Sequence, residues 1–364
     1  MVHYHQLPVT LVPSSTSMKL FDAHNHIHLG LHGLTPIITS STRMHHPNAT
    51  FAGAAIMSTH PRDYSAVESV VRELRERSYN AVPCYGVHPW FLNDVITDPE
   101  ATRVLENGEE LWLNELKERL QMHPDAIVGE IGLDGARWVE QDDGYRVNSV
   151  VDENIKKQSA DKSIWDRKRT LACPMSLQKD AFIKQLLLAA ELKRPVSIHV
   201  VRAWGELFDS LDEVREKMKQ KHEMLRIHAS KNSSGILEKQ KNMRSKIKEV
   251  LLPPKIYFHA FSGKAGILPS LLSACAKGNI DPNSDVYFGF APAIPNFYAP
   301  KTPSIMRQIG LHRLLLETDL EDASCAWEDL LRCLEGVAGA LEVDVQEAAD
   351  QTFKNAECFY FNNR

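Results

Sequence analysis

Eight short runs of β-branched, aromatic and other apolar residues recur along the chain, and most are followed by polar sequence with helical periodicity. Their first residues lie about 30 positions apart in most places, a spacing that suits a strand followed by a helix. Repeated βα units of this kind favour a parallel sheet. The runs are residues 20–26, 54–58, 81–87, 126–131, 195–201, 255–261, 285–290 and 314–318.

Two gaps between the runs are much longer than the others, and they decide how the 364 residues are divided. Removing roughly 40 residues from each gap brings the chain near the ~250 residues of an eight-stranded barrel. We therefore predict one α/β domain over 1–364, a TIM-type (β/α)8 barrel with two large insertions. Its core covers about 19–361, its insertions about 135–177 and 214–255, and 1–17 is an N-terminal extension. An open doubly wound sheet is the alternative, since no periodicity closes a barrel, and we find no glycine-rich dinucleotide or phosphate-loop motif.

The composition is that of an ordinary globular protein, with 43% hydrophobic and 24% charged residues. A net charge of -5 provides no general attraction for nucleic acid. No run approaches the roughly 18 apolar residues of a membrane span, and residues 1–17 lack the features of a secretory signal. Six scattered cysteines without a Cys-x-x-Cys motif indicate reduced thiols, so we predict a cytoplasmic and/or nuclear protein with no membrane contact. They are Cys84, Cys173, Cys275, Cys325, Cys333 and Cys358.

The two insertions differ in character. Residues 135–177 are polar and of mixed charge, and they follow the fourth predicted strand. Loops at that end of a barrel build the substrate pocket, so we expect this one to form a lid. Residues 214–255 carry twelve Lys and Arg against four Glu, an excess of eight positive charges that leaves -13 on the rest of the chain. Such a segment is either a patch that attracts phosphates or a solvated helical hairpin.

Histidines and carboxylates stand at the end of five of the eight runs, where barrel enzymes place their catalytic groups. Burying these charges would cost several kcal/mol unless they are paired or bound to metal. Four imidazoles and two carboxylates form a typical ligand set for Zn²⁺, Mn²⁺ or another divalent ion. Each residue alone could be a hydrogen-bonded core residue or a helix cap, but the set together predicts a metal site. The six are His24, His26, Glu130, His199, His259 and Asp319.

With these residues in place, the chain resembles the TatD family of metal-dependent hydrolases and deoxyribonucleases, and more closely the longer, fungal branch of that family. The resemblance runs from about residue 19 to 361 and omits the two insertions. The matching motifs are 21–26 (FDAHNH), 86–89 (GVHP), 129–134 (GEIGLD), 198–199 (IH), 259–263 (HAFSG), 316–319 (LETD) and 352–355 (TFKN).

The resemblance implies a TIM-type barrel that holds one or two divalent ions (Zn, Mg or Mn). A ligand that bridges two cations should be anionic, and Glu130 is the carboxylate nearest the middle of the strand order. By the resemblance, one ion is bound by His24, His26, Glu130 and Asp319, and the other by Glu130, His199 and His259.

The catalytic residues expected from these ligands are Asp319 and Glu130. A metal-held water loses its proton near neutral pH, and Asp319 would orient or deprotonate it. Glu317 and Asp22 are expected to support the ligands from behind. Expected substrate contacts are His88, Trp90, Asp134 and Arg202.

Three motifs depart from the family pattern. Arg202 stands three residues after His199, where the family has His-x-Arg. Trp90 replaces the second histidine of the usual Gly-x-His-Pro-His, and Glu321 and Asp322 stand near the usual Ala-Pro. The metal ligands are unchanged, whereas the contacts to a polyanionic substrate differ.

Three functions fit these observations. The first is a divalent-metal-dependent phosphodiesterase or deoxyribonuclease that acts on DNA ends. The second is a hydrolase of the same scaffold with an ester or amide substrate, because fold and metal do not determine the substrate. The third is a largely non-catalytic protein that binds a protein partner through the basic insertion 214–255.

Overall fold

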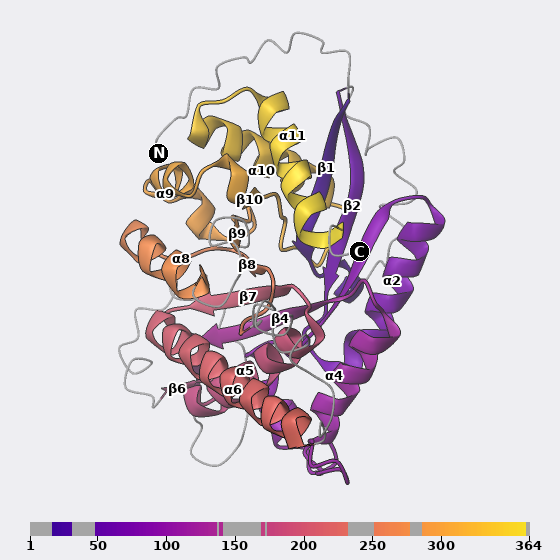
Figure 1. The fold of residues 1–364 in the computed structure, drawn as a ribbon. Coiled ribbons are helices and arrows are strands. Elements are labelled where there is room, and N and C mark those ends of the chain that lie inside the picture. Colours follow the sequence, from indigo (N-terminus) through magenta and orange to yellow (C-terminus); the bar gives the residue numbers. More distant parts are fainter. Residues whose placement is uncertain are drawn as a thin grey trace.

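The computed structural model describes residues 17–30, 48–136, 138–140, 169–171, 173–231, 251–276 and 286–361. Eight parallel strands form its central sheet, and neighbours in the sheet are also neighbours among these strands in the chain. Figure 1 shows the strands surrounded by helices. The strands are β1 (Met18–Asn25), β2 (Ala49–Met57), β3 (Asn80–Tyr85), β4 (Ile127–Asp134), β7 (Val196–Val201), β8 (Ile256–Phe258), β9 (Val286–Gly289) and β10 (Leu314–Leu315).

Hydrogen bonds between the first strand and the segment after the last one close the sheet into a nearly complete barrel. The Ala23 amide donates to the Leu316 carbonyl at 2.8 Å, and the Asp319 amide donates to the His24 carbonyl at 2.9 Å. An open doubly wound sheet would leave these two edges apart. The predicted (β/α)8 barrel is therefore confirmed, and each of the eight predicted runs contributes a strand.

Helices follow the strands and cover the outside of the barrel. Their buried faces carry the apolar residues, as in α2, where Val67, Val71 and Leu74 recur at helical spacing. Helix α2 packs against β3, α5 against β4 and α11 against β1. The helices are α2 (Tyr64–Glu76), α3 (Leu92–Ile96), α4 (Leu111–Met122), α5 (Met175–Leu192), α6 (Trp204–Lys231), α8 (Leu268–Ala276), α9 (Thr302–Ile309), α10 (Ala326–Leu341) and α11 (Val345–Ala356).

The C-terminal segment packs against residues of the barrel strands. Phe359 and Tyr360 are buried in one cluster with Phe21, Tyr257 and Tyr287. The Tyr360 hydroxyl donates to the Ala23 carbonyl at 2.6 Å, which ties this segment to β1.

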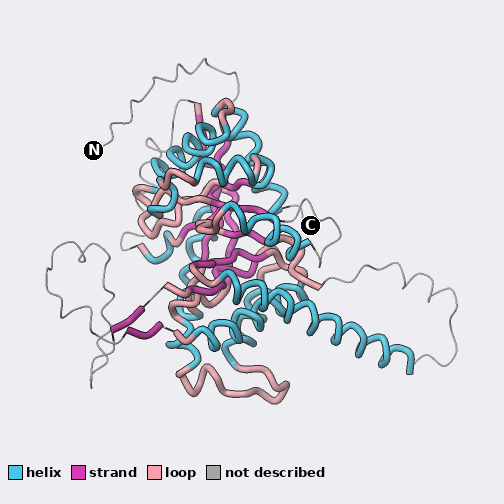
Figure 2. Tube along the Cα trace, turned by 90° about the vertical axis from the view of Figure 1, so that its left-hand side faces the viewer, coloured by secondary structure: helices cyan, strands magenta, loops and turns pink. Residues whose placement is uncertain are grey.

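The predicted insertions lie partly outside the described residues. Within 135–177, β5 (Trp138–Glu140) and β6 (Arg169–Leu171) pair as an antiparallel hairpin set apart from the barrel (Figure 2). Within 214–255, residues 214–231 continue α6, which projects beyond the other helices (Figure 2). Residues 1–16, 141–168 and 232–250 of the predicted extension and insertions lie outside the description. Among the described helices, none combines the length and apolarity that a membrane crossing needs.

Candidate metal centre

The six predicted ligand residues converge, although they come from five separate parts of the chain. His24 lies in β1 and His26 directly follows it. Glu130 and His199 lie within β4 and β7, and His259 follows β8 directly. The chain continues four residues past β10 to reach Asp319. All six side chains meet where the strands end.

One group of ligand atoms forms around the first strand. The Nε2 atoms of His24 and His26 are 3.2 Å apart, and they lie 3.4 and 3.1 Å from Glu130 Oε2. Asp319 Oδ1 lies 3.6 Å from His24 Nε2 and 3.5 Å from His26 Nε2. Ligands about 2.1 Å from a tetrahedral ion are separated by about 3.4 Å. His24, His26 and Glu130 therefore offer three ligand atoms at the spacing of a divalent site, and Asp319 lies at a similar distance from the two imidazoles.

The second group forms around the other oxygen of Glu130. Its Oε1 lies 2.7 Å from His259 Nε2, 3.1 Å from His88 Nε2 and 3.2 Å from His199 Nδ1. Each oxygen of the buried glutamate thus faces a different set of imidazole nitrogens, which is the geometry of a bridge. We expected His199 and His259 in this set. His88, an expected substrate contact, also lies against Glu130. Its Nδ1 accepts from the Trp90 amide at 3.1 Å, so in the neutral ring Nε2 carries the proton and faces the glutamate as a donor.

Hydrogen bonds behind the ligands determine which ring nitrogen is available. His26 Nδ1 lies 2.9 Å from the Met57 carbonyl, so it carries the proton and leaves Nε2 as a ligand. Nε2 of His199 lies 3.2 Å from Asp134 Oδ2 and donates to it, which leaves Nδ1 toward Glu130. Nδ1 of His24 lies 3.2 Å from the Ser197 hydroxyl.

The charges of the site are set by burial and by its neighbours. Burial lowers the pKa of His24 to about 3 and that of His88 to about 4, so both rings are neutral. Burial opposes the negative charge of Glu130, but the surrounding imidazoles outweigh it and hold its pKa well below the usual range. In His199 burial is outweighed by the hydrogen bonds to Asp134 and Glu130, and the pKa rises to about 9.

These residues fit a divalent ion. The donor set is all imidazole nitrogen and carboxylate oxygen, which suits Zn²⁺ or Mn²⁺. Nδ1 of buried His259 has no hydrogen-bond partner among the described residues, although a buried polar atom normally has one, and its Nε2 lies 2.7 Å from Glu130 Oε1 without the geometry of a hydrogen bond. Its ring stacks on that of His24, with centroids 3.8 Å apart. A cation at this position would give His259 Nε2 a partner in place of that missing hydrogen bond.

The predicted supporting residues behave differently from the ligands. The Asp22 carboxylate turns to Thr318, accepting from its amide at 3.0 Å and its hydroxyl at 2.7 Å. Glu317 is fully buried and accepts from the Ala260 amide at 2.8 Å and from the Tyr257 hydroxyl. Both residues therefore hold the backbone around the site, as expected.

Two predicted substrate contacts, Trp90 and Asp134, already have partners in the protein. Trp90 Nε1 donates to Asp134 Oδ2 at 2.6 Å, and the same carboxylate oxygen faces His199. Trp90 is nonetheless 38% exposed, so one part of its ring is open to a ligand. Arg202 is exposed at the end of β7 and does not join the ligand cluster.

The backbone after the strands adopts uncommon conformations at the site. Arg202, Ala260 and Asp319 have φ of 51°, 41° and 57°, in the left-handed region that non-glycine residues rarely occupy. Such conformations cluster at functional sites, where surrounding contacts hold them in place. In β4, a Cβ on Gly132 would lie 1.9 Å from the His199 carbonyl, so only glycine lets these strands approach so closely.

Sequence reasoning missed Ser197 and Tyr257, which support His24 and Glu317. Ser197 lies two residues before His199, so strand alternation could have placed it on the same face. Nothing in the sequence near Tyr257 indicated a carboxylate partner 60 residues away.

Comparisons with known proteins agree with this architecture. A family model described as TatD related DNase matches residues 21–361. Cut9-interacting protein scn1 of Schizosaccharomyces pombe is 22% identical over 341 residues, which cover 86% of this chain and 92% of that protein.

Solved structures show the same fold at low sequence identity. An uncharacterized amidohydrolase from Saccharomyces cerevisiae superposes with a TM-score of 0.59 at 14% identity, covering 94% of this chain and 100% of the other. A TatD family hydrolase from Entamoeba histolytica superposes with a TM-score of 0.56 at 14% identity, covering 95% and 99%. With a family match over nearly its whole length, the chain belongs to the TatD-related DNase family of hydrolases.

Proposed function

We propose that residues 1–364 form a single divalent-metal-dependent phosphodiesterase that releases nucleotides from DNA ends. The observation that carries the proposal is the position of Glu130, whose two oxygens face two separate sets of imidazole nitrogens. One or two ions (Zn, Mg or Mn) held by these sets would acidify an attacking water and polarise a phosphate oxygen. A narrow cluster at the mouth of a barrel reaches a strand end more readily than the middle of a stiff duplex.

Asp319 is the residue we assign to the attacking water. Its side chain is 15% exposed, more than that of His24, His26 or Glu130, so it is the ligand most open to solvent. The imidazoles beside it, which outweigh the effect of burial, lower its pKa and keep it ionised. An ionised carboxylate at this position orients water and accepts its proton.

His88 and Asp134 have roles on the opposite side of Glu130. His88 is neutral, and its Nε2, which now faces Glu130, is the nitrogen that we assign to a phosphate or leaving oxygen once a metal ion occupies the glutamate. Asp134 keeps His199 oriented and anchors Trp90, whose exposed part is available to the substrate.

Partner binding is the second candidate function. Met224 and Leu225, near the end of projecting α6, are 60% and 58% exposed, as apolar residues at an interface are before binding. The name of the fission yeast relative states an interaction with Cut9. An ester or amide substrate on the same scaffold is the third candidate. The cytoplasmic or nuclear location stays a prediction.

Hydrolysis of 3′-labelled single-stranded DNA with Mg²⁺, Mn²⁺ or Zn²⁺ tests the proposal. The matched control is Asp319→Asn, which keeps the shape of the side chain and removes its charge. We expect metal-dependent nucleotide release that the variant lacks. Turnover of a model ester without turnover of DNA would indicate that the substrate is an ester and not DNA. An inactive protein whose partner binding requires residues 214–255 would favour the second candidate.

A further inference from the structure

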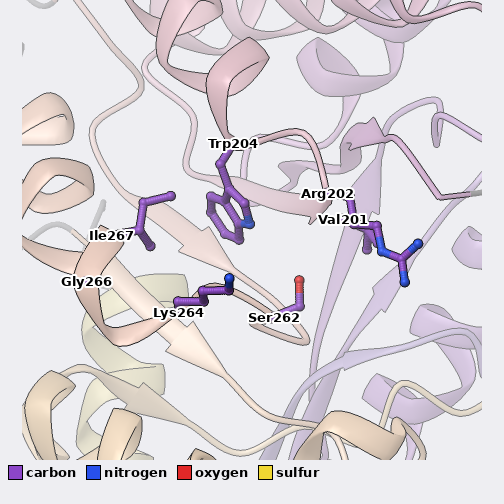
Figure 3. Close-up of a pocket in the computed structure, with 7 residues that line it drawn as sticks. All are labelled: Val201, Arg202, Trp204, Ser262, Lys264, Gly266 and Ile267. Atoms are coloured by element: carbon purple, nitrogen blue, oxygen red, sulfur yellow. The ribbon is translucent and has the colours of Figure 1, made fainter.

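A cavity of about 630 Å³ lies between the loops that follow β7 and β8 (Figure 3). Arg202, on one side, is three residues after His199, and Lys264, on the other, is five residues after His259. The same two strands therefore supply both metal ligands and cavity walls. Its size is within the range of about 300–1,000 Å³ that is typical of small-molecule sites.

An indole ring dominates the apolar part of the cavity. Trp204 stands in the middle of the view, with Ile267 to one side of it (Figure 3). Its ring packs edge-on against buried Phe261, with centroids 5.3 Å apart and planes at 65°. Phe261 can take this position because residue 263 is glycine; a Cβ added there would lie 2.4 Å from the Phe261 ring. The indole is therefore held in place before any ligand arrives.

The polar part of the cavity is positively charged. The lining includes Lys264 and Arg202 but no carboxylate, and neither cation forms an ion pair with the described residues. Lys264 extends toward Trp204, whereas the Arg202 guanidinium points outward beyond Ser262 (Figure 3). The Ser262 hydroxyl donates a hydrogen bond to the Val200 carbonyl at 3.1 Å. Lys264 thus lies next to the indole in this view, and Arg202 lies farther along the cavity, beyond Ser262 (Figure 3).

We propose that this cavity is a nucleotide subsite, in which one nucleobase of the substrate stacks on Trp204 while Lys264 and Arg202 bind the phosphates on its two sides. Each base has a flat face, so stacking on an aromatic side chain works for any sequence. A nucleotide inside a strand carries a phosphate on either side, which suits two cations better than a free mononucleotide does. The assignment rests on the phosphodiesterase function proposed above and specifies how its substrate is held.

Calorimetric titration of the full chain in EDTA measures binding without turnover. The probe is deoxyadenosine 3′,5′-bisphosphate, compared with deoxyadenosine 5′-monophosphate, deoxyadenosine and inorganic phosphate. Gly266→Leu fills the cavity, since a Cβ there meets no atom within 4 Å. Gly205→Leu is the matched control, because Gly205 is equally open and neighbours Trp204 but does not line the cavity. Circular dichroism checks that each variant folds.

We expect the bisphosphate to bind more tightly than the other three probes. Gly266→Leu should weaken it by about tenfold or more, Trp204→Ala by about 5- to 150-fold from lost stacking, and Gly205→Leu by less than about twofold. Any of three results would overturn the proposal. The first is wild-type affinity in Gly266→Leu, and the second is inorganic phosphate that binds as tightly as the bisphosphate. The third is no bisphosphate binding at millimolar concentration. Because this assay contains no metal, its result is independent of whether Asp319→Asn abolishes hydrolysis.

Discussion

Replacing Gly289 by alanine tests how the barrel supports the His259 loop. Gly289 is the last residue of β9, and an added Cβ would lie 2.1 Å from the Tyr257 hydroxyl and 2.5 Å from Glu317 Cδ. Tyr257 and Glu317 are both fully buried and bonded to each other. Glu317 also holds the Ala260 amide, directly after His259. The new methyl group must therefore push apart the pair that supports this loop.

The cost follows from the overlap. Ordinary contacts begin near 3.4 Å, so the tyrosine hydroxyl must move by more than 1 Å. Overpacking a core costs about 1–3 kcal/mol, and a buried polar group that loses its partner costs about 1–3 kcal/mol more. Alanine also makes the unfolded chain less flexible than glycine does, which offsets about 0.4–1 kcal/mol of this cost. Because the overlap is deep and involves two buried groups, we expect a loss of about 3–5 kcal/mol in the free energy of unfolding.

Thermal unfolding followed by circular dichroism measures this loss. An unfolding entropy of about 2.1 cal/mol/K per residue converts it into a melting temperature about 4–7 °C lower for 364 residues. The control is Gly339→Ala in α10, where a Cβ meets no atom within 4 Å and helix propensity gains about 0.5–1 kcal/mol. If Gly289→Ala has the same melting temperature as the wild type while the control behaves as expected, the supporting role assigned to the Tyr257–Glu317 pair is refuted.

Three further outcomes are expected. Zn²⁺ or Mn²⁺ added to chelator-treated protein should stabilise it by about 2.7 kcal/mol at 100 times the Kd, and calorimetry of Glu130→Gln should show no such gain. Asp134→Asn removes the anionic partner of His199, so chelator competition should report metal affinity about 10- to 100-fold weaker; unchanged affinity would exclude a positioning role. Burial raises the pKa of Cys173 to about 11, so at pH 8 only about one thousandth of it is thiolate. Mass spectrometry should find exposed Cys325 alkylated first, and Cys173 labelling should accelerate about tenfold per pH unit below that pKa.

Local sequence predicted the strands well because each strand is an apolar run between helical segments. Their ends were less predictable. β2 begins at Ala49, five residues before the predicted start, because Met18 and Lys19 of β1 pair with Ala49 and Thr50. β8 stops at Phe258, and two residues later Ala260 has a left-handed backbone. Pairing partners and backbone reversals of this kind depend on distant residues.

The residues of the candidate metal site were predictable, since a histidine or carboxylate at the end of a buried strand is costly without a partner. The local sequence around His24, Glu130 or Asp319 is enough for this prediction. The local sequence does not reveal that His88 lies as close to Glu130 as His199 does, because the three come from β4, β7 and the segment after β3.

The sequence by itself therefore determined the parallel βα architecture, the residue types at the strand ends and the family resemblance, because these depend on local patterns of apolar and polar residues. Closure of the barrel, the division of the two Glu130 oxygens between ligand groups and the cavity at Trp204 were decided only by the tertiary structure. Each depends on contacts between residues far apart in the chain, whose distances no local pattern encodes.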